Sequence, residues 1–571
     1  ESGEADAVRA RHRDYYTAMA ATLDAPAGGD YEQRIEQADI EIDNLRAAFS
    51  WSREKSDVEL ALALASSLQP LWQARGRLRE GLTWFDTAFT DLDAHQRRVT
   101  PAVRARALAD MATLGVWVTS AECQDQAQQA LAIAREVDDT ALLIRALTAR
   151  GYVAAYFDAE AAGAYLAEAS GLARDLDDRW RLSQILVAQV VVGLVARNPI
   201  TARAAAEEGR DLADAIGDRF DARRCRWYLG VAQINQGDLA GAVAQFAAVA
   251  DEAEAAHDEI WRVDSLVGLG VSLGYQGDTA AARAAAVEAV EATAELGGLK
   301  AAAAYHVLAF AALAAGDVAA AQDALKAGWP LVSAVPQTAG VQRFLSAEAA
   351  LASGDLVAAR RWADDAVSKK ASIFGWDPLT THARVALAQG EPEQAERDAH
   401  EALAGAAEVE AYVFIPDILE CLGTLAGDAG SHREAARLFG AAYAIRQRMG
   451  AVRLKVYDAG YKASVAILRD AMTDNDFDAA WAEGAALSTE EAIAYAQRGR
   501  GQRKRPTSGW ASLTPTERDV VRLVSEGLSN NDIATRLFVS PRTVQTHLTH
   551  VYTKLELSSR VQLVQEAARH T

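Results

Sequence analysis

The sequence predicts an all-α protein in which a long array of paired helices precedes a small helical domain at the C-terminus. Alanine is abundant, aromatic residues make up only 7% of the chain, and runs of β-branched residues are short. These features favour helices over strands. At 571 residues the chain is too long for one hydrophobic core, which indicates several domains or a repeat. Turn residues do recur about every 40 positions through much of it.

Residues 1–95 are expected to form a helical entry segment that precedes the repeat. Ile42–Phe49 and Leu71–Gly76, followed by Glu80, Gly81 and Trp84, resemble the region after the nucleotide-binding core of large signal-transducing ATPase regulators. An ATPase would need a GxxxxGK[ST] loop to hold phosphate, and this chain does not contain one. Alternatively, these are simply the first helical hairpins. Because the chain begins with Glu1 rather than Met, we expect it to be part of a longer protein.

Residues 96–497 are expected to form the helical-repeat domain. Helix-ending signals recur at Asp139, Asp178, Asp218, Asp258 and Gly298, at spacings of 39, 40, 40 and 40. Turn residues lie halfway between them and continue beyond, at Asp158, Asn198-Pro199, Gly237-Asp238, Gly277-Asp278, Gly316-Asp317, Gly354-Asp355, Gly390-Glu391 and Gly430. Each unit is therefore predicted to be two helices of about 15–18 residues joined by a turn.

These units resemble tetratricopeptide repeats. The matching positions are Leu229-Gly230, Gly237-Asp238, Ala242 and Phe246, then Leu269-Gly270, Gly277-Asp278 and Ala282, then Leu422-Gly423, Gly430, Ala435 and Phe439. The period of about 40, rather than 34, is a departure from that family. The resemblance implies hairpins stacked into a superhelix whose concave face binds a protein or small-molecule effector. Candidate groove residues are Trp227, Tyr228, Trp261, Tyr275 and Tyr305, and the alternative for each is a place in the core.

The array is expected to end in a terminal cap at Glu434–Ala496, followed by a basic, Gly-containing linker at residues 498–510. The linker either touches phosphates or keeps the final domain solvated. From Arg498 onward there are twelve Lys or Arg residues against six Asp or Glu residues, although the whole chain has a net charge of −21. An acidic body repels DNA, so the charge distribution places DNA contact at the C-terminus.

The last domain, residues 511–571, is predicted from its capping signals and apolar spacing. Thr514, Pro515 and Glu517 form a capping-box pattern, and Gly527 ends that helix. Ser529 starts a second helix, and Ser540-Pro541 starts a third. In the third helix the apolar residues fall on one buried stripe, Val544, Leu548, Val551 and Leu555.

The opposite face of that third helix is polar and nearly free of acid. It carries Arg542, Thr543, Gln545, Thr546, Thr549, His550 and Lys554. A helix held from behind by a small core, with polar side chains forward, fits the major groove of double-stranded DNA. The geometry assigns base reading to Gln545, Thr546 and Thr549 and phosphate contact to Arg542, Thr543 and Lys554; His547 lies nearer the buried edge. The alternative is a helical hairpin whose polar face is ordinary solvated surface.

The same segment resembles the LuxR-type helix-turn-helix domain. The matching residues are Leu513-Thr514, Glu517, Gly527, Ser529-Asn530, Ile533-Ala534, Leu537, Ser540, Thr543-Val544, His547, Lys554-Leu555 and Arg560. The resemblance implies four helices with the third as recognition helix, base contacts at the three positions named above, and a fourth helix, Ser558–Arg569, that pairs two copies in a homodimer. Gln545 and Asn531 stand where the family usually has basic residues, which weakens general phosphate attraction.

No catalytic residues, cofactor-binding motif or metal site are identified in the sequence. The three cysteines are far apart and fit buried, reduced thiols in a cytoplasmic protein. No apolar run reaches the roughly 18–20 residues that span a bilayer, so no membrane partner is expected. We therefore expect a bacterial transcription regulator, and not an enzyme, in which a helical-repeat region senses an effector. The alternatives are a repeat scaffold for protein assembly, or the regulatory tail of a larger signalling ATPase or cyclase.

Overall fold

The computed structural model describes residues 2–26, 28–94, 98–118, 122–196, 198–293, 296, 298–332, 339–368, 378–498, 509–510, 513, 515–537, 541–555, 557, 559–567 and 570. All secondary structure in these residues is helical, which confirms the predicted all-α class. The chain divides into two compact units, Glu1–Ile493 and Ala494–Thr571, described separately below. None of the described helices has the length and apolar content needed to cross a membrane.

The entry segment consists of mutually packed helices of 6 to 20 residues. Phe49 stacks on Trp84 with ring centroids 4.2 Å apart, and Trp72 and Phe85 are completely buried. Asp57 caps the fourth helix by accepting a hydrogen bond from the Leu60 amide. The elements are α1 (Ser2–Ala21), the 3₁₀ turn η1 (Thr22–Asp24), α2 (Tyr31–Ile40), α3 (Ile42–Glu54), α4 (Val58–Ser67), α5 (Gln69–Ala74) and α6 (Leu78–Ala94).

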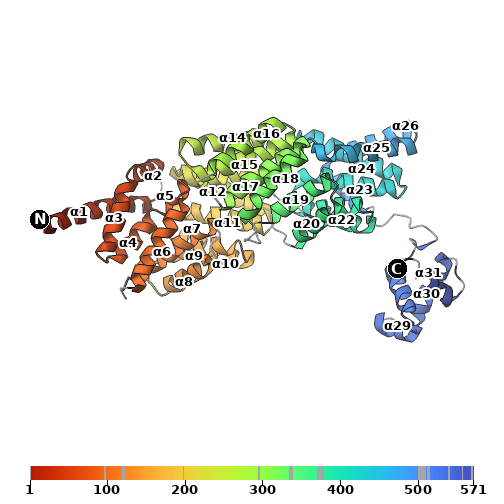
Figure 1. Cartoon of the computed structure of the whole chain (residues 1–571), viewed down its shortest axis with the longest axis horizontal. Helices are drawn as coiled ribbons and strands as arrows, with labels where there is room; N and C mark the ends of the chain where they lie inside the picture. Colours follow the sequence, from red (N-terminus) through yellow and green to blue (C-terminus); the bar gives the residue numbers. More distant parts are fainter. Residues whose placement is uncertain are drawn as a thin grey trace. The chain divides into compact units, whose positions relative to one another are not determined.

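The next part is an array of nine antiparallel hairpins within the described residues, each packed on the one before (Figure 1). This confirms the predicted helical-repeat architecture. The pairs are α7 (Pro101–Trp117) and α8 (Cys123–Ala134); α9 (Thr140–Ala154) and α10 (Ala159–Asp175); α11 (Arg179–Val195) and α12 (Pro199–Ile216); α13 (Arg219–Gln236) and α14 (Leu239–Ala255); α15 (Glu259–Gln276) and α16 (Thr279–Ala292); α17 (Gly298–Ala315) and α18 (Val318–Val332); α19 (Ala339–Ala352) and α20 (Leu356–Ser368); α21 (Pro378–Ala388) and α22 (Pro392–Glu408); and α23 (Ile415–Asp428) and α24 (His432–Met449).

The 40-residue period arises from repeated N-caps. Asp139, Asp178, Asp218 and Asp258 each accept a hydrogen bond from the backbone amide three residues later, at 3.0–3.4 Å. These residues therefore begin the first helix of each hairpin, whereas the sequence analysis treated them as the ends of the preceding helices. An Asp at this position satisfies an amide that the helix itself leaves free.

Small and large residues interlock between the two helices of a hairpin, as the tetratricopeptide resemblance implies. A Cβ at Gly230 would lie 2.8 Å from the Phe246 ring, and a Cβ at Gly423 would lie 3.0 Å from the Phe439 ring. Both rings are buried. Glycine is therefore required at these positions by the closeness of the packed ring, not by an unusual backbone angle.

Four of the five proposed groove residues are core residues instead. Trp227, Tyr228 and Trp261 are buried and meet edge to face, with centroids 5.0–5.8 Å apart, and Tyr275 packs on Phe310. That expectation is wrong for these four because the stacking of one hairpin on the next already buries their rings. The fifth, Tyr305, is partly buried.

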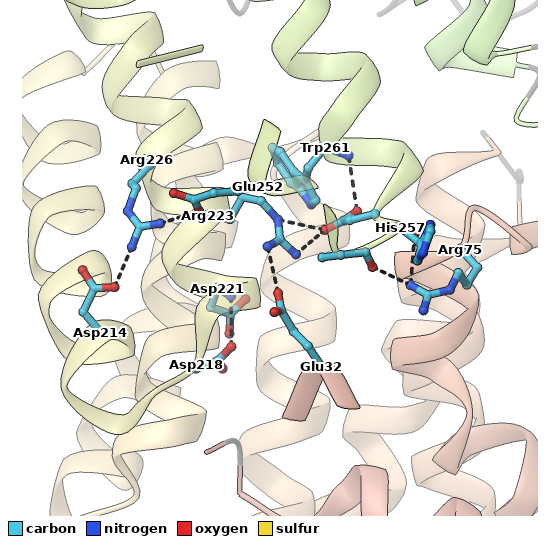
Figure 2. Close-up of polar contacts among 12 residues, drawn as sticks. Glu32, Arg75, Asp214, Asp218, Asp221, Arg223, Arg226, Glu252, His257 and Trp261 are labelled. Carbon is cyan, nitrogen blue, oxygen red and sulfur yellow. Dashed lines mark hydrogen bonds and ion pairs between the residues drawn. The ribbon is translucent and has the colours of Figure 1, made fainter. Parts of the chain in front are cut away.

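The entry segment is attached to the array by an ion pair and by hydrogen bonds to backbone carbonyls (Figure 2). Arg223 in α13 is 2% exposed and pairs with Asp258 at 2.9 Å and with Glu32 of α2 at 2.8 Å. Arg75 donates to the carbonyl oxygens of Ala256 and His257 at 2.9 and 3.0 Å. The entry helices thus lie against hairpins that follow them by some 190 residues in sequence.

The ninth hairpin is followed by η3 (Lys455–Tyr457), α25 (Asp458–Ala471), α26 (Asp474–Ala485) and α27 (Thr489–Arg498), while the 3₁₀ turn η2 (Tyr412–Phe414) lies between α22 and α23. The predicted cap, Glu434–Ala496, thus begins inside α24 of that hairpin. Cys123, Cys225 and Cys421 are buried and unpaired, as expected. Burial raises the pKa of each thiol. Most of the predicted linker, residues 499–508, lies outside the described residues.

Candidate nucleic-acid interface

In the residues that the structure describes from Gly509 onward, four helices surround one small core, as the family resemblance implies. They are α28 (Pro515–Ser525), α29 (Asn530–Leu537), α30 (Pro541–Leu555) and α31 (Arg560–Ala567). The predicted stripe on α30 is confirmed: Val544, Leu548 and Val551 are at most 2% exposed, and Leu555 packs on the same core. The back of α30 is therefore fixed against the other three helices.

Local signals place the ends of these helices. Gly527 adopts a left-handed φ of 83° and follows the end of α28. Ser529 and Asp532 then form a reciprocal capping box, since the Asp532 amide donates to Ser529 Oγ at 3.3 Å and the Ser529 amide donates to Asp532 Oδ2 at 3.2 Å. The hydrogen bonds from Ser529 hold the pKa of Asp532 below its usual value. Thr514 and residues 538–540 lie outside the described residues.

The outward face of α30 is polar where its side chains are described. Gln545, Thr549 and His550 are exposed, and His547 is only partly exposed, as its place near the buried edge predicts. Thr549 Oγ1 donates to the carbonyl oxygen of Gln545 at 2.9 Å. Three further candidates on this helix, Arg542, Thr543 and Thr546, have side chains that lie outside the description.

Gln545 is held by a chain of polar contacts that joins three helices. Asn530 Nδ2 donates to Gln545 Oε1 at 2.9 Å, and Arg560 Nη1 donates to Asn530 Oδ1 at 3.0 Å. Arg560 Nη2 also donates to the carbonyl oxygen of Leu528. The Gln545 amide therefore has a fixed orientation before any ligand is bound. The sequence analysis missed this role of Asn530 and Arg560, although both belong to the matched family pattern.

Lys554, a predicted phosphate contact, forms an ion pair within the C-terminal unit. Its ammonium lies 2.7 Å from Glu517 Oε2, and Glu517 is only 2% exposed. His550 Nδ1 is 4.0 Å from the other carboxylate oxygen. This pair joins α28 to α30, so Lys554 has a structural partner that competes with DNA phosphate.

No group of three or more His, Cys, Asp or Glu residues that could hold a metal ion occurs among the described residues. The unit offers instead a helix that is rigid on its buried side and rich in hydrogen-bonding groups on the other. Such an arrangement can read the edges of DNA bases.

The C-terminal unit matches a known protein family. Residues 511–567 match the family model "Bacterial regulatory proteins, luxR family". Over 577 aligned residues the whole chain is 56% identical to proteins of Mycobacterium bovis and Mycobacterium tuberculosis named as HTH-type transcriptional regulators, and it spans 65% of their length. The nitrate/nitrite response regulator protein NarL of Escherichia coli is 46% identical over 50 residues, which is 9% of this chain and 23% of NarL.

Among solved structures, NprR in complex with its cognate peptide NprX aligns with a TM-score of 0.44 and 9% identity, covering 61% of this chain and 97% of that one. A score at this level transfers neither a detailed fold nor a ligand.

Proposed function

We propose that this chain, whose residues 511–567 match the family of LuxR-type bacterial regulatory proteins, is a transcription regulator that inserts α30 into the major groove of double-stranded DNA. The observation that carries the proposal is the two-sided character of α30. Its back is fixed by Val544, Leu548 and Val551, while the amide of Gln545 stands exposed on the front and is oriented by Asn530.

The side chains divide into two roles. Gln545 and Thr549 read bases, because both are exposed opposite the buried stripe near the N-terminal half of the helix, which is the half that enters the groove in helix-turn-helix proteins. Thr546, placed on the same face by sequence spacing, is assigned the same role. A glutamine amide pairs with adenine, accepting from N6 and donating to N7. Arg542, Thr543 and Lys554 contact phosphates, and His550 lies on the same face beside Lys554.

The test starts by selecting bound duplexes from a random-sequence library with the full chain. Gln545→Ala should then lose about 1–3 kcal/mol of discrimination at one base pair of the selected sequence. The matched control is Gln129→Ala, which removes the same amide from an exposed position on α8. Equal losses on selected and scrambled duplexes would exclude base reading by Gln545. A library that yields no enriched sequence would favour a repeat scaffold instead.

Two further parts of the proposal concern control. The helical-repeat array receives a protein or small-molecule effector that changes DNA affinity. The last helix, within Ser558–Arg569, pairs two copies of the chain. Support for the pairing comes from Val564, an apolar side chain 36% exposed on α31, next to Leu563, which is completely buried.

A further inference from the structure

A cavity of about 120 Å³ lies inside the first unit, between the array and the entry segment. Its walls come from α7, α9, α11 and α13, the first helices of four successive hairpins. Its roof comes from the entry segment and includes Leu23, Tyr31 and Gln73. We call this space the inner cavity. About 10–15 Å³ of such volume holds one water molecule, so the cavity has room for a molecule the size of an amino acid.

The repeat register brings equivalent residues of successive hairpins into this wall. Trp180 and Phe220 each stand two residues after an N-cap, at Asp178 and Asp218, and both line the inner cavity. The position six residues after the N-caps Asp139, Asp178 and Asp218 is polar in each hairpin, and its three residues also line the cavity: Arg145, Gln184 and Arg224. The repeat thus places three polar side chains and two aromatic rings in the wall of one cavity.

The guanidinium groups of the wall all have carboxylate partners. Arg145 pairs with Asp110 at 2.7 Å, Arg224 pairs with Asp221 at 2.9 Å, and Arg181 pairs with Asp178. Each of these positive charges is therefore neutralised within the protein.

Asp218 is different, because its carboxylate has no cationic partner within ion-pair distance among the described residues. Its Oδ1 accepts from the Asp221 amide at 3.1 Å (Figure 2), while its buried Oδ2 has no hydrogen-bond partner. The side chain is 1% exposed. Burial, followed by the charge of Asp221, raises the pKa of Asp218 to about 7. A buried polar atom without a partner needs an explanation, since its lost hydration is not replaced by a hydrogen bond within the protein.

Three groups in the same wall that can donate a hydrogen bond are also buried without a partner: Trp180 Nε1, Arg224 Nε and the Tyr152 hydroxyl. Asp110 Oδ2 is a further buried acceptor without a hydrogen bond, but it lies 3.8 Å from Arg106 Nε. The inner cavity therefore presents one carboxylate without a cationic partner, that of Asp218, together with these three donor groups and the rings of Tyr31 and Phe220.

We propose that the inner cavity binds a small zwitterion, a free amino acid or a close derivative, as the effector of the regulator. Its ammonium group lies on Asp218 Oδ2 and its carboxylate faces Trp180 Nε1 and Arg224 Nε. An ammonium suits Asp218 better than a neutral hydroxyl does, because a positive charge also relieves the repulsion between Asp218 and Asp221. The assignment of the ligand as effector rests on the proposed function; the assignment of the site does not.

The first experiment is a thermal-shift screen of the full chain against each of the twenty free L-amino acids at millimolar concentration, followed by calorimetry on any that bind. At least one amino acid should raise the melting temperature by several degrees. Its 2-hydroxy-acid analogue, which lacks the amine, should bind at least ten-fold more weakly. No shift with any amino acid, or equal binding of the analogue, would overturn the proposal.

Asp218→Asn tests the anchoring carboxylate without removing the helix cap, because Asn caps a helix as well as Asp does. This variant should bind the amino acid at least ten-fold more weakly, while its ligand-free melting temperature at pH 8 stays the same or rises. The matched control is Asp238→Asn, since Asp238 is an exposed N-cap of α14 outside the cavity. Trp180→Phe keeps the ring and removes the donor, so it should weaken binding by a smaller factor. Unchanged affinity in Asp218→Asn would refute the anchoring role.

Two readouts separate this inference from the proposed function. DNA binding to the selected duplex is measured with and without the amino acid. If the chain binds DNA selectively and no amino acid binds, the inner-cavity assignment fails and the proposed function stands. If an amino acid binds through Asp218 but no DNA sequence is enriched, the site stands and its role as an effector site fails.

Discussion

Removing the ammonium of Lys554 should loosen the C-terminal domain more than it changes the electrostatics of DNA binding. Glu517 is 2% exposed, and its side chain pairs with Lys554 at 2.7 Å across α28 and α30. Taking one partner away from a buried pair typically costs about 3–5 kcal/mol. The Lys554 side chain is 26% exposed, so water already screens part of the interaction. We therefore expect a loss of about 2 kcal/mol for Lys554→Met, which keeps most of the aliphatic stem.

The assay is native-state hydrogen exchange of the full chain, read by mass spectrometry on peptides from α28 and α30, because it reports the free energy of opening of this domain alone. Glu517→Gln together with Lys554→Met leaves no unpaired charge, so the double variant should recover at least half of the loss. A loss below about 0.5 kcal/mol for Lys554→Met, or a double variant no more stable than the single one, would refute the reasoning.

The same variant separates the two roles of Lys554. If its ammonium stays with Glu517 in the complex, the slope of log affinity against log salt should be unchanged in Lys554→Met. If Lys554 leaves Glu517 for a phosphate, the slope should fall by roughly one. The salt titration uses the selected duplex, and Gln129→Ala again serves as the control.

Three further predictions concern packing, pH and assembly. Gly484→Ala should destabilise the first unit by about 1–3 kcal/mol, because the added Cβ would clash with the Arg437 carbonyl oxygen. Gly460→Ala in α25, where the added Cβ meets nothing, should instead stabilise the same unit by about 0.5–1 kcal/mol. Thermal melts measure both. The folded-state pKa of Asp218, about 7, lies above the value of about 3.9 for an unfolded chain, so the folded state binds more protons in that window. Stability should therefore fall as pH rises from 4 to 7, and Asp218→Asn should flatten that part of the melting profile; an unchanged profile would contradict it. Val564→Lys should lower the dimer fraction in sedimentation on the selected duplex, and an unaltered fraction would exclude α31 as the pairing surface.

The C-terminal domain could be predicted from sequence as far as local signals reach. The buried stripe of α30, the stop at Gly527 and the start at Ser529 all follow from spacing within a few residues. The contacts of Lys554 and Asn530 do not. Each depends on a partner 15 to 37 positions away, whose approach is decided by how the helices cross and not by the pattern of any one of them. The sequence analysis consequently identified the exposed face of α30 and missed the contacts that orient Gln545 on it.

In the array, too, local signals could be predicted from the sequence and contacts between distant residues could not. The Asp and Gly punctuation predicted the hairpins, because a cap acts on its own helix. The choice of groove aromatics failed because it took ring size as the criterion. Repeat position was the better signal: Trp180 and Phe220 both occupy the second place after an N-cap and both reach the inner cavity, whereas Trp227 and Trp261 fall elsewhere in the repeat and are core residues.

The roof of the inner cavity was the least predictable part, and it gives the site a route to the rest of the molecule. The wall belongs to a regular stack, in which each hairpin contacts mainly its neighbours, so a ligand touching the wall alone would act locally. The roof belongs to the entry segment, which is held to the array by Glu32 and Arg223 and by Arg75. A ligand between the two would bind best when roof and wall are closed on it, and a ligand shifts an equilibrium only by its differential affinity for the two states. Glu32→Gln removes the ion pair with Arg223 and leaves the residues that line the cavity unchanged, so it should weaken amino-acid binding. An affinity equal to that of the unaltered chain would show that the entry segment takes no part in binding.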